Sequence, residues 1–436
     1  MWRVLSLTFL LVPAVAMFEQ TPTSGSAKQT LSPAEQGMAR ARDAIANGGK
    51  QYQPYNALAQ ALIRRARETS DASYYIQAEE TLRQSLALSP RNFDAQKIEV
   101  QILLGQREFA EARDLAKTLN RQTPDDVMVY GYLADSYSAL GDYEDAEKAT
   151  NWMLRLRPGN VPSLVRGAYL RKVFGDVEGA IELLNQAYDK TPPNEVEERA
   201  WILTQTADFR LLKGQVDKAD RLVQQAAELF PGYGPTLEML ARVRSAQHKY
   251  IEAAEALQER NRTLPTPETL YSMATALERA NRIEEAKTAY SDFEKHARQQ
   301  VSVPRNANRE LVFYYVDHAH NPSEALRVAQ LEAAKRHDVF TLDAYAWALW
   351  ANGQYKDASV QSERALATGI RDAQLLYHAG MISSGLKEQA ASENYLRESL
   401  ELNPFSEVSA AAREALEKLS LHAVSADAAK NVTAEY

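Results

Sequence analysis

The chain has 436 residues and contains no cysteine. This absence excludes disulfides, cysteine nucleophiles, thiolate metal sites and lipid attachment at a cysteine. Glycine is scarce, with 18 residues, and no stretch between turn signals alternates apolar and polar residues as a half-buried strand does. The sequence therefore predicts an all-α protein.

The short motifs of common enzymes are also missing: HExxH, the phosphate-binding GxxxxGK[ST], the dinucleotide-binding GxGxxG and the GxSxG elbow. The nearest candidate is a turn with His318 and His320 beside Asp317, residue types that can hold a divalent metal. However, side chains two apart on a helix diverge, and turns are normally polar. We therefore expect no catalytic, metal or cofactor site, and keep a metal-dependent enzyme at the His318/His320 turn as the less favoured alternative.

Positive charge is in the minority, with 50 basic against 58 acidic residues and a formal net charge of −8. Nonspecific nucleic-acid binding needs clustered lysine and arginine to neutralise phosphates. The best basic cluster, Arg64, Arg65 and Arg67, is interpreted as a solvated helix face beside Glu68. Nucleic acid is therefore not an expected partner.

The first residues differ from the rest of the chain. Arg3 precedes an apolar run from Val4 to Val12, and Ala14-Val15-Ala16 supplies a small-x-small cleavage site, as in a secretory signal. The uncharged run is broken by Pro13 and is shorter than the roughly 20 residues of a membrane span. We expect an exported protein, periplasmic or secreted, with no stable membrane span after cleavage; retention of the segment as an anchor stays open.

Prolines recur with a fixed period. Pro90, Pro124, Pro158 and Pro192 are equally spaced, and Pro231 and Pro265 resume the same step after an insertion. An alanine precedes each of these prolines at a constant offset, and usually another precedes that alanine at the same offset, as in Ala134-Ala146-Pro158 and Ala168-Ala180-Pro192. Helices pack closely where side chains are small, and proline ends a helix. Each period thus predicts one helical hairpin.

The turn inside each hairpin is periodic too. A glycine follows the first alanine by seven residues at Gly141, Gly175, Gly214 and Gly353, where a left-handed C-cap is expected. The second copy has Val100 in place of the alanine and Gly105 two residues early, which predicts a longer turn. Five-residue insertions after Pro192 and around Pro304 predict loops on one rim and local changes of pitch.

These residues resemble the tetratricopeptide repeat, whose period of about 34 residues is that of the prolines. The third copy matches best, with the residues Tyr130, Leu133, Ala134, Tyr137, Gly141, Ala146 and Pro158. The resemblance implies a right-handed α-α superhelix of antiparallel helix pairs, a solenoid, with about ten units.

One elongated domain is expected. Its parts are a signal peptide at 1–16, a flexible leader at 17–32, a leading helix and the start of the first hairpin at 33–58, about ten units at 59–406, a capping helix at 407–420 and a disordered tail at 421–436.

The resemblance also implies a binding groove. In the family the first helix of each unit lines the concave face, at positions three before, one after and four after its small residue. Carried over, these positions are Lys97, Tyr169, Lys172, Arg242, Tyr271, Tyr314, Trp347, Trp350 and Tyr377. Trp347 and Trp350 lie three apart and face the same way, so we predict exposed aromatic anchors; alternatively the rings fill the gap between neighbouring first helices.

The function expected from this groove is a noncatalytic protein-protein interaction scaffold that binds a peptide or helical segment of a partner. An envelope-assembly or export factor that bridges several proteins is the alternative.

Overall fold

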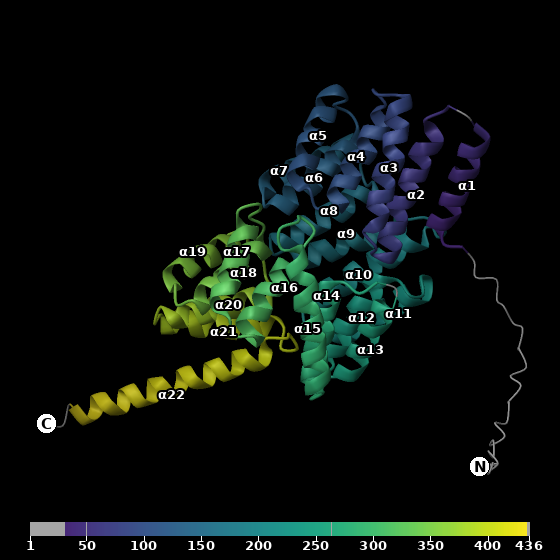
Figure 1. Cartoon of the computed structure of the whole chain (residues 1–436). Coiled ribbons are helices and arrows are strands. Elements are labelled where there is room, and N and C mark those ends of the chain that lie inside the picture. Colours follow the sequence, from purple (N-terminus) through teal and green to yellow (C-terminus); the bar gives the residue numbers. More distant parts are fainter. Residues whose placement is uncertain (1–30, 49, 263, 434–436) are drawn as a thin grey trace, which may run out of the picture.

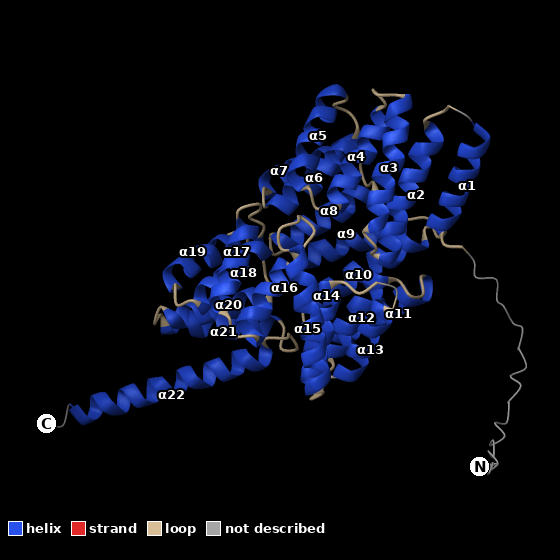
Figure 2. Cartoon of the chain, in the orientation of Figure 1, coloured by secondary structure: helices blue, strands red, loops and turns tan. Residues whose placement is uncertain are grey.

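The computed structural model describes residues 31–48, 50–262 and 264–433, with side chains through Leu421. These residues form 22 α-helices and one π-helical turn, and no strand occurs among them (Figure 2). The signal peptide predicted at 1–16 and nearly all of the leader predicted at 17–32 lie outside the described residues. In the part of the chain that is described, each helix is too short or too polar to cross a membrane.

The helices pack in sequential pairs, and most first helices also contact the first helix of the neighbouring pair (Figure 1). The first helices are α2 Gln53–Thr69, α4 Phe93–Gly105, α6 Val127–Leu140, α8 Val161–Val173, α10 Val196–Leu212, α12 Gly234–Ala246, α14 Pro267–Arg279, α16 Asn308–Phe313 continued by the π turn η1 Tyr314–His318, α18 Val339–Ala351 and α20 Ala373–Gly385. The second helices are α3 Ser73–Leu88, α5 Phe109–Gln122, α7 Tyr143–Leu156, α9 Val177–Lys190, α11 Val216–Leu229, α13 Tyr250–Asn261, α15 Ile283–Gln300, α17 Pro322–Ala333, α19 Tyr355–Leu366 and α21 Gln389–Leu402. α1 Pro33–Gly48 precedes the ten pairs and α22 Ser409–Thr433 follows them. The predicted all-α fold of about ten repeats is confirmed.

The regularly spaced alanines lie where the two helices of a pair touch. Ala168 and Ala180 are both fully buried, as are Ala207 and Ala219. In the last pair, the hydroxyl of Ser392 donates to the carbonyl oxygen of Gly380 at 2.8 Å, so the second helix reaches the backbone of the first. The crossing points predicted from the small residues are confirmed.

The left-handed turn residue recurs in every pair in which it was predicted, for example at Gly141 (φ 92°) and Gly353 (φ 72°). The second pair was predicted to have a longer turn, and this is wrong. Gly105 is still helical, and Arg107, seven residues after Val100, takes the left-handed conformation with φ 63°. The offset is therefore unchanged, because the geometry of the hairpin sets it rather than the presence of glycine.

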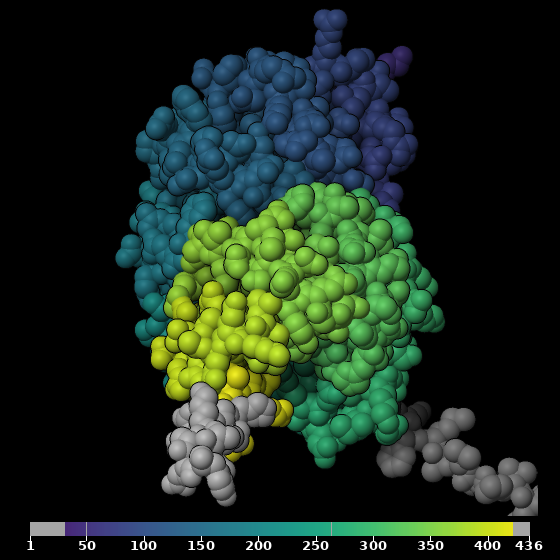
Figure 3. All heavy atoms as spheres, turned by 90° about the vertical axis from the view of Figure 1, so that its left-hand side faces the viewer, coloured from purple at the N-terminus to yellow at the C-terminus, as the bar shows by residue number. Residues whose placement is uncertain are grey.

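The superhelix coils until distant repeats touch (Figure 1), and the C-terminal repeats lie against the N-terminal ones (Figure 3). The N–H of His337 donates to the carbonyl oxygen of Leu140 at 2.9 Å, and the N–H of Val339 donates to the Tyr143 hydroxyl at 3.0 Å. One core cluster includes side chains from α7, α8, α18 and α20. The solenoid is thus closed partly on itself.

Both insertions take part in such contacts. Glu195 and Glu197, at the start of α10, form ion pairs with Arg64 at 2.9 Å and Arg67 at 3.5 Å. The carbonyl oxygen of Asn306, in the second insertion, accepts from Arg107 at 2.8 Å.

The basic cluster on α2 was interpreted above as a solvated face, but two of its members, Arg64 and Arg67, pair with the start of α10, because coiling brings the fifth repeat against the first. The third, Arg65, pairs with Glu35 and Glu68.

At the C-terminus, α22 runs from Ser409 to Thr433 and extends away from the packed helices (Figure 1). Its helical backbone continues through most of the residues predicted to be disordered after 420. Residues 423–429 contain four alanines, and alanine has the highest helix propensity. This local preference favours a helix over the disorder predicted from the small and polar composition of the tail.

Candidate functional site

We call the first-helix positions that were selected by their spacing from the small residue the inner positions. In repeats 2 to 6, residues at these positions form ion pairs that link neighbouring repeats. Nζ of Lys97 lies 3.0 Å from a carboxylate oxygen of Asp126. Lys172 and Arg242 both contact Asp208, at 3.4 and 2.7 Å. The cations predicted to line the groove are therefore each engaged by a carboxylate of a neighbouring repeat.

Asp208 is the residue of this group that the sequence reasoning missed. Its side chain is 14% exposed and lies between two cations. Burial opposes its ionisation, but the charges of Lys172 and Arg242 outweigh this and lower the pKa of Asp208 to about 2. The sequence did contain the information needed to find Asp208. It directly follows Ala207, and the position one after the small residue is one of those that selected the cations.

Tyr169 belongs to the contact between superhelical turns. It is half-buried and packs against the core cluster shared by α7 and α18. Burial raises the pKa of Tyr169 to about 12. The neighbouring Lys172 lies over the ring of Phe340, 5.6 Å from its centroid. These two groove residues thus also contact the repeats of the opposite turn.

The aromatic residues of α18 and α20 form a stack. The rings of Trp347 and Trp350 are parallel, 4.1 Å apart, and the other face of Trp347 stacks on His378 at 4.2 Å. His378 contacts the carboxylate of Asp343 at 2.9 Å, and the two side chains are 2% and 5% exposed.

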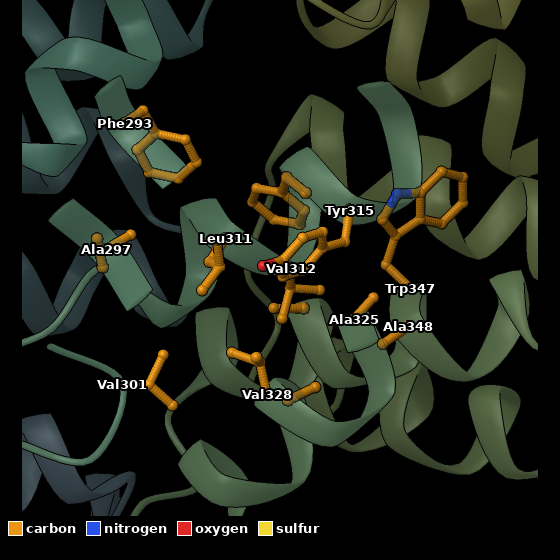
Figure 4. Packing of buried hydrophobic residues seen from close by; sticks show 14 of the residues in the cluster. Phe293, Ala297, Val301, Leu311, Val312, Tyr315, Ala325, Val328, Trp347 and Ala348 are labelled. Carbon is orange, nitrogen blue, oxygen red and sulfur yellow. The ribbon is translucent and has the colours of Figure 1, made fainter. Parts of the chain in front are cut away.

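Trp347 is only 3% exposed, so the expectation that it is an exposed anchor is wrong. Its ring fills the gap between neighbouring first helices, the alternative considered from the sequence, and it belongs to a core cluster with Tyr315 and Val328 (Figure 4).

Four predicted groove residues remain half-buried: Tyr271 on α14, Tyr314 in η1, Trp350 on α18 and Tyr377 on α20. They pack against the core cluster of repeats 7 to 9 and are only partly buried. We call these four residues the aromatic strip. Trp350 is held further by its indole N–H, which donates to the carbonyl oxygen of Met381 at 3.0 Å.

The candidate metal turn does not converge on one point. His318 contacts the hydroxyl of Tyr290 at 3.1 Å and a carboxylate oxygen of Glu278 at 3.2 Å. Burial lowers the pKa of His318, although Glu278 opposes this. His320 takes the left-handed turn conformation with φ 49°. Among the residues that the structure describes, no group of three or more histidine, aspartate or glutamate side chains could hold a metal ion.

Residues 373–406, the α20–α21 pair, match the family model described as tetratricopeptide repeat. The ten sequential helix pairs have the all-α architecture of tetratricopeptide-repeat structures, and proteins with such repeats generally mediate protein-protein interactions. No curated protein matches the chain in sequence.

Several solved structures are similar at low identity. A human IFIT1 dimer with PPP-AAAA is 13% identical over 86% of this chain and 96% of that chain, with a TM-score of 0.49. The APC/C hetero-tetramer Cut9-Hcn1 gives 14% identity over 87% of this chain and a TM-score of 0.45, and this chain spans 59% of that one. TTC0263, a thermophilic TPR protein in Thermus thermophilus, is 22% identical over 43% of this chain and 98% of that chain, with a TM-score of 0.36. Similarity at this level carries no conclusion about binding or activity.

Proposed function

We propose that the protein is a noncatalytic scaffold that binds a peptide or helical segment of a partner along the concave face of the solenoid. The observation that supports this proposal is the aromatic strip, a row of half-exposed rings on consecutive first helices over a close-packed core. Aromatic rings are the residues that most often dominate binding energy in protein interfaces.

The strip is preorganised for binding. Trp350 is fixed by its stack on Trp347 and by its hydrogen bond to Met381. Tyr377 lies against Trp347, with ring centroids 5.8 Å apart. Side chains that are already held in one position lose little conformational entropy when a partner binds.

Charges in the neighbouring repeats can set the register of the partner. Arg242 keeps 49% of its side chain exposed while one nitrogen contacts Asp208. Charged groups around an interface contribute more to orientation and specificity than to affinity.

We also propose that the protein is exported, on the basis of its N-terminal sequence. Mass spectrometry of the protein from its native cells tests this: export with cleavage gives a chain that begins at Met17, whereas a chain that still begins at Met1 contradicts it.

The alternative, a bridging factor that binds on both faces, is favoured by one observation. Trp152 on α7, a second helix, is 47% exposed, stacks on Tyr130 and lies under the guanidinium of Arg155. Tryptophan, tyrosine and arginine are the residues enriched at interface hot spots.

An array of immobilised peptides probed with the purified protein tests the scaffold proposal. The variant Tyr314→Leu/Tyr377→Leu retains apolar bulk but removes two rings of the strip, and we expect its affinity for bound peptides to fall about tenfold or more, equivalent to about 1.4 kcal/mol. Trp152→Ala is the control on the other face, with circular dichroism to verify folding. Unchanged binding by the double variant contradicts the proposal, and a loss caused by Trp152→Ala supports bridging.

A further inference from the structure

Asp317, in η1, is an exposed carboxylate that contacts the aromatic stack of α18. One of its oxygens accepts the indole N–H of Trp347 at 3.0 Å. Within the described residues, no lysine or arginine forms an ion pair with it; the cationic groups that act on its charge are histidines. Its second oxygen is therefore available.

Two residues of the aromatic strip, Tyr271 and Tyr377, are linked to Asp317. The charge of Asp317 contributes, after burial, to raising the pKa of Tyr271, and likewise to raising the pKa of Tyr377 to about 12. The ring of His318, the residue after Asp317, lies 6.0 Å from that of Tyr271 on α14. The ring of Trp347, which donates to Asp317, lies 5.8 Å from that of Tyr377 on α20. Although Asp317 is exposed, the surrounding protein reduces the solvation of its carboxylate, and this raises its own pKa.

Three arginines of repeats 6 to 8 are engaged by other partners. Arg242 pairs with Asp208 at 2.7 Å, and Arg309 pairs with Glu310 at 3.1 Å. Arg279 donates to the carbonyl oxygen of Glu407 at 3.0 Å rather than to Asp317. The charge of Glu407, like that of Asp317, acts on Tyr271.

We propose that Asp317 and the rings of Tyr271 and Tyr377 form a site for a lysine or arginine side chain of the partner segment. This inference rests on the proposed function and names the class of segment that the concave face takes. A cation there pairs with the free oxygen of Asp317 and lies against aromatic faces, to which cations are attracted. Its methylene stem packs on the apolar strip. Trp347 is a positioning residue, because its N–H orients the carboxylate.

The test uses two sets of peptides, identical except that the central residue is lysine or arginine in one set and glutamate or norleucine in the other. We expect the wild-type protein to bind the basic set about tenfold more tightly than the glutamate peptides. Asp317→Asn should abolish this preference, yet it should fold normally, because an amide oxygen still accepts the Trp347 N–H. Asp145→Asn on the outer helix α7, where the side chain is 52% exposed and paired with Lys148, removes the same charge and should keep the preference.

A spectroscopic readout separates contact at the site from a general charge effect. The indole N–H resonance of Trp347 should shift when a lysine peptide is added to wild-type protein, and this shift should be absent in Asp317→Asn. Peptide binding without a basic preference, or with a preference that Asp317→Asn leaves intact, overturns the inference and leaves the scaffold proposal standing. Absence of binding to every peptide class overturns the scaffold proposal, and this inference with it.

Discussion

Repeats 1 to 6, helices α2–α13, and repeats 7 to 10, helices α14–α21, share one backbone plan but fill their inner positions differently. We call them the proline-ladder repeats and the aromatic repeats. Lys172, Asp208 and Arg242 link three of the proline-ladder repeats by charge, whereas His378, Trp347 and Trp350 link two aromatic repeats by stacking. Both regions bury small residues where the helices of a hairpin cross.

The difference shows that the hairpin and the inner surface are separate features of a repeat. Small residues at the helix crossing determine how the two helices of one pair pack. Inner positions contact mainly the neighbouring repeats, so their chemistry can change along the solenoid without altering the pairs. The aromatic repeats also contain the π turn η1, and π turns often occur at functional sites.

The largest effect is expected from removing the buried ring of the stack. Trp347→Ala should cost about 3 to 5 kcal/mol of unfolding free energy, because it leaves a cavity and takes the hydrogen-bond donor from Asp317. Trp152→Ala, in the proline-ladder repeats and 47% exposed, should cost less than about 1 kcal/mol. Urea titration followed by circular dichroism measures both. Equal losses would show that the stack does not stabilise the aromatic repeats.

Substitutions at two glycines test whether the contact between the proline-ladder repeats and the aromatic repeats stabilises the protein. Gly141 and Gly353 both have positive φ, but a Cβ on Gly141 would lie 2.5 Å from the carbonyl group of His337, while one on Gly353 meets no atom within 4 Å. Gly353→Ala should therefore cost about 1 to 2 kcal/mol from backbone strain alone. Gly141→Ala should cost about 3 kcal/mol, because it also separates the third repeat from the ninth. Thermal unfolding of the two variants compares them, and similar midpoints would contradict the contact between turns.

Acid titration should distinguish the two carboxylates by the sign of their effect. The pKa of Asp208 is lowered to about 2 from an ordinary value of 3.8. Its ionised form therefore stabilises the fold above about pH 4, and this stability is lost as the pH falls toward 2. The contribution is about 2 kcal/mol. The difference in unfolding free energy between wild-type protein and Asp208→Asn should shrink over that range, and a constant difference would contradict the pairing.

Ionisation of Asp317 should change the unfolding free energy in the opposite direction to that of Asp208, and this is the smallest of the predicted effects. Its pKa is raised, since its solvation is reduced and no lysine or arginine of the described chain pairs with it. Its ionisation is therefore unfavourable in the folded protein, and stability falls as the pH rises through its pKa. Asp317→Asn should remove this fall, measured by urea titration between pH 3 and pH 6. If Asp317→Asn is less stable than wild-type protein at pH 6, the negative charge of Asp317 is already balanced by a cationic group of the folded protein.

For much of the candidate site, the sequence predicted which position on a first helix each residue occupies, but not how deeply the residue is buried or what it contacts. Spacing from the small residue located Tyr271, Tyr314, Trp350 and Tyr377 on first helices, and all are half-buried there. The same spacing selected Trp347, but its burial depends on His378 from the next repeat, which stacks on it. Asp317 was noticed as a metal ligand beside two histidines; its actual neighbour is a tryptophan from the next repeat, Trp347.

The sequence by itself determined the helix pairs and their approximate number, because these depend on residues within one period of the chain, above all the small residue at each helix crossing. Only the tertiary structure decided which repeats meet across superhelical turns, as Arg64 meets Glu195 and Leu140 meets His337. Such contacts depend on small rotations between neighbouring repeats that accumulate along the solenoid, and no single repeat records their sum.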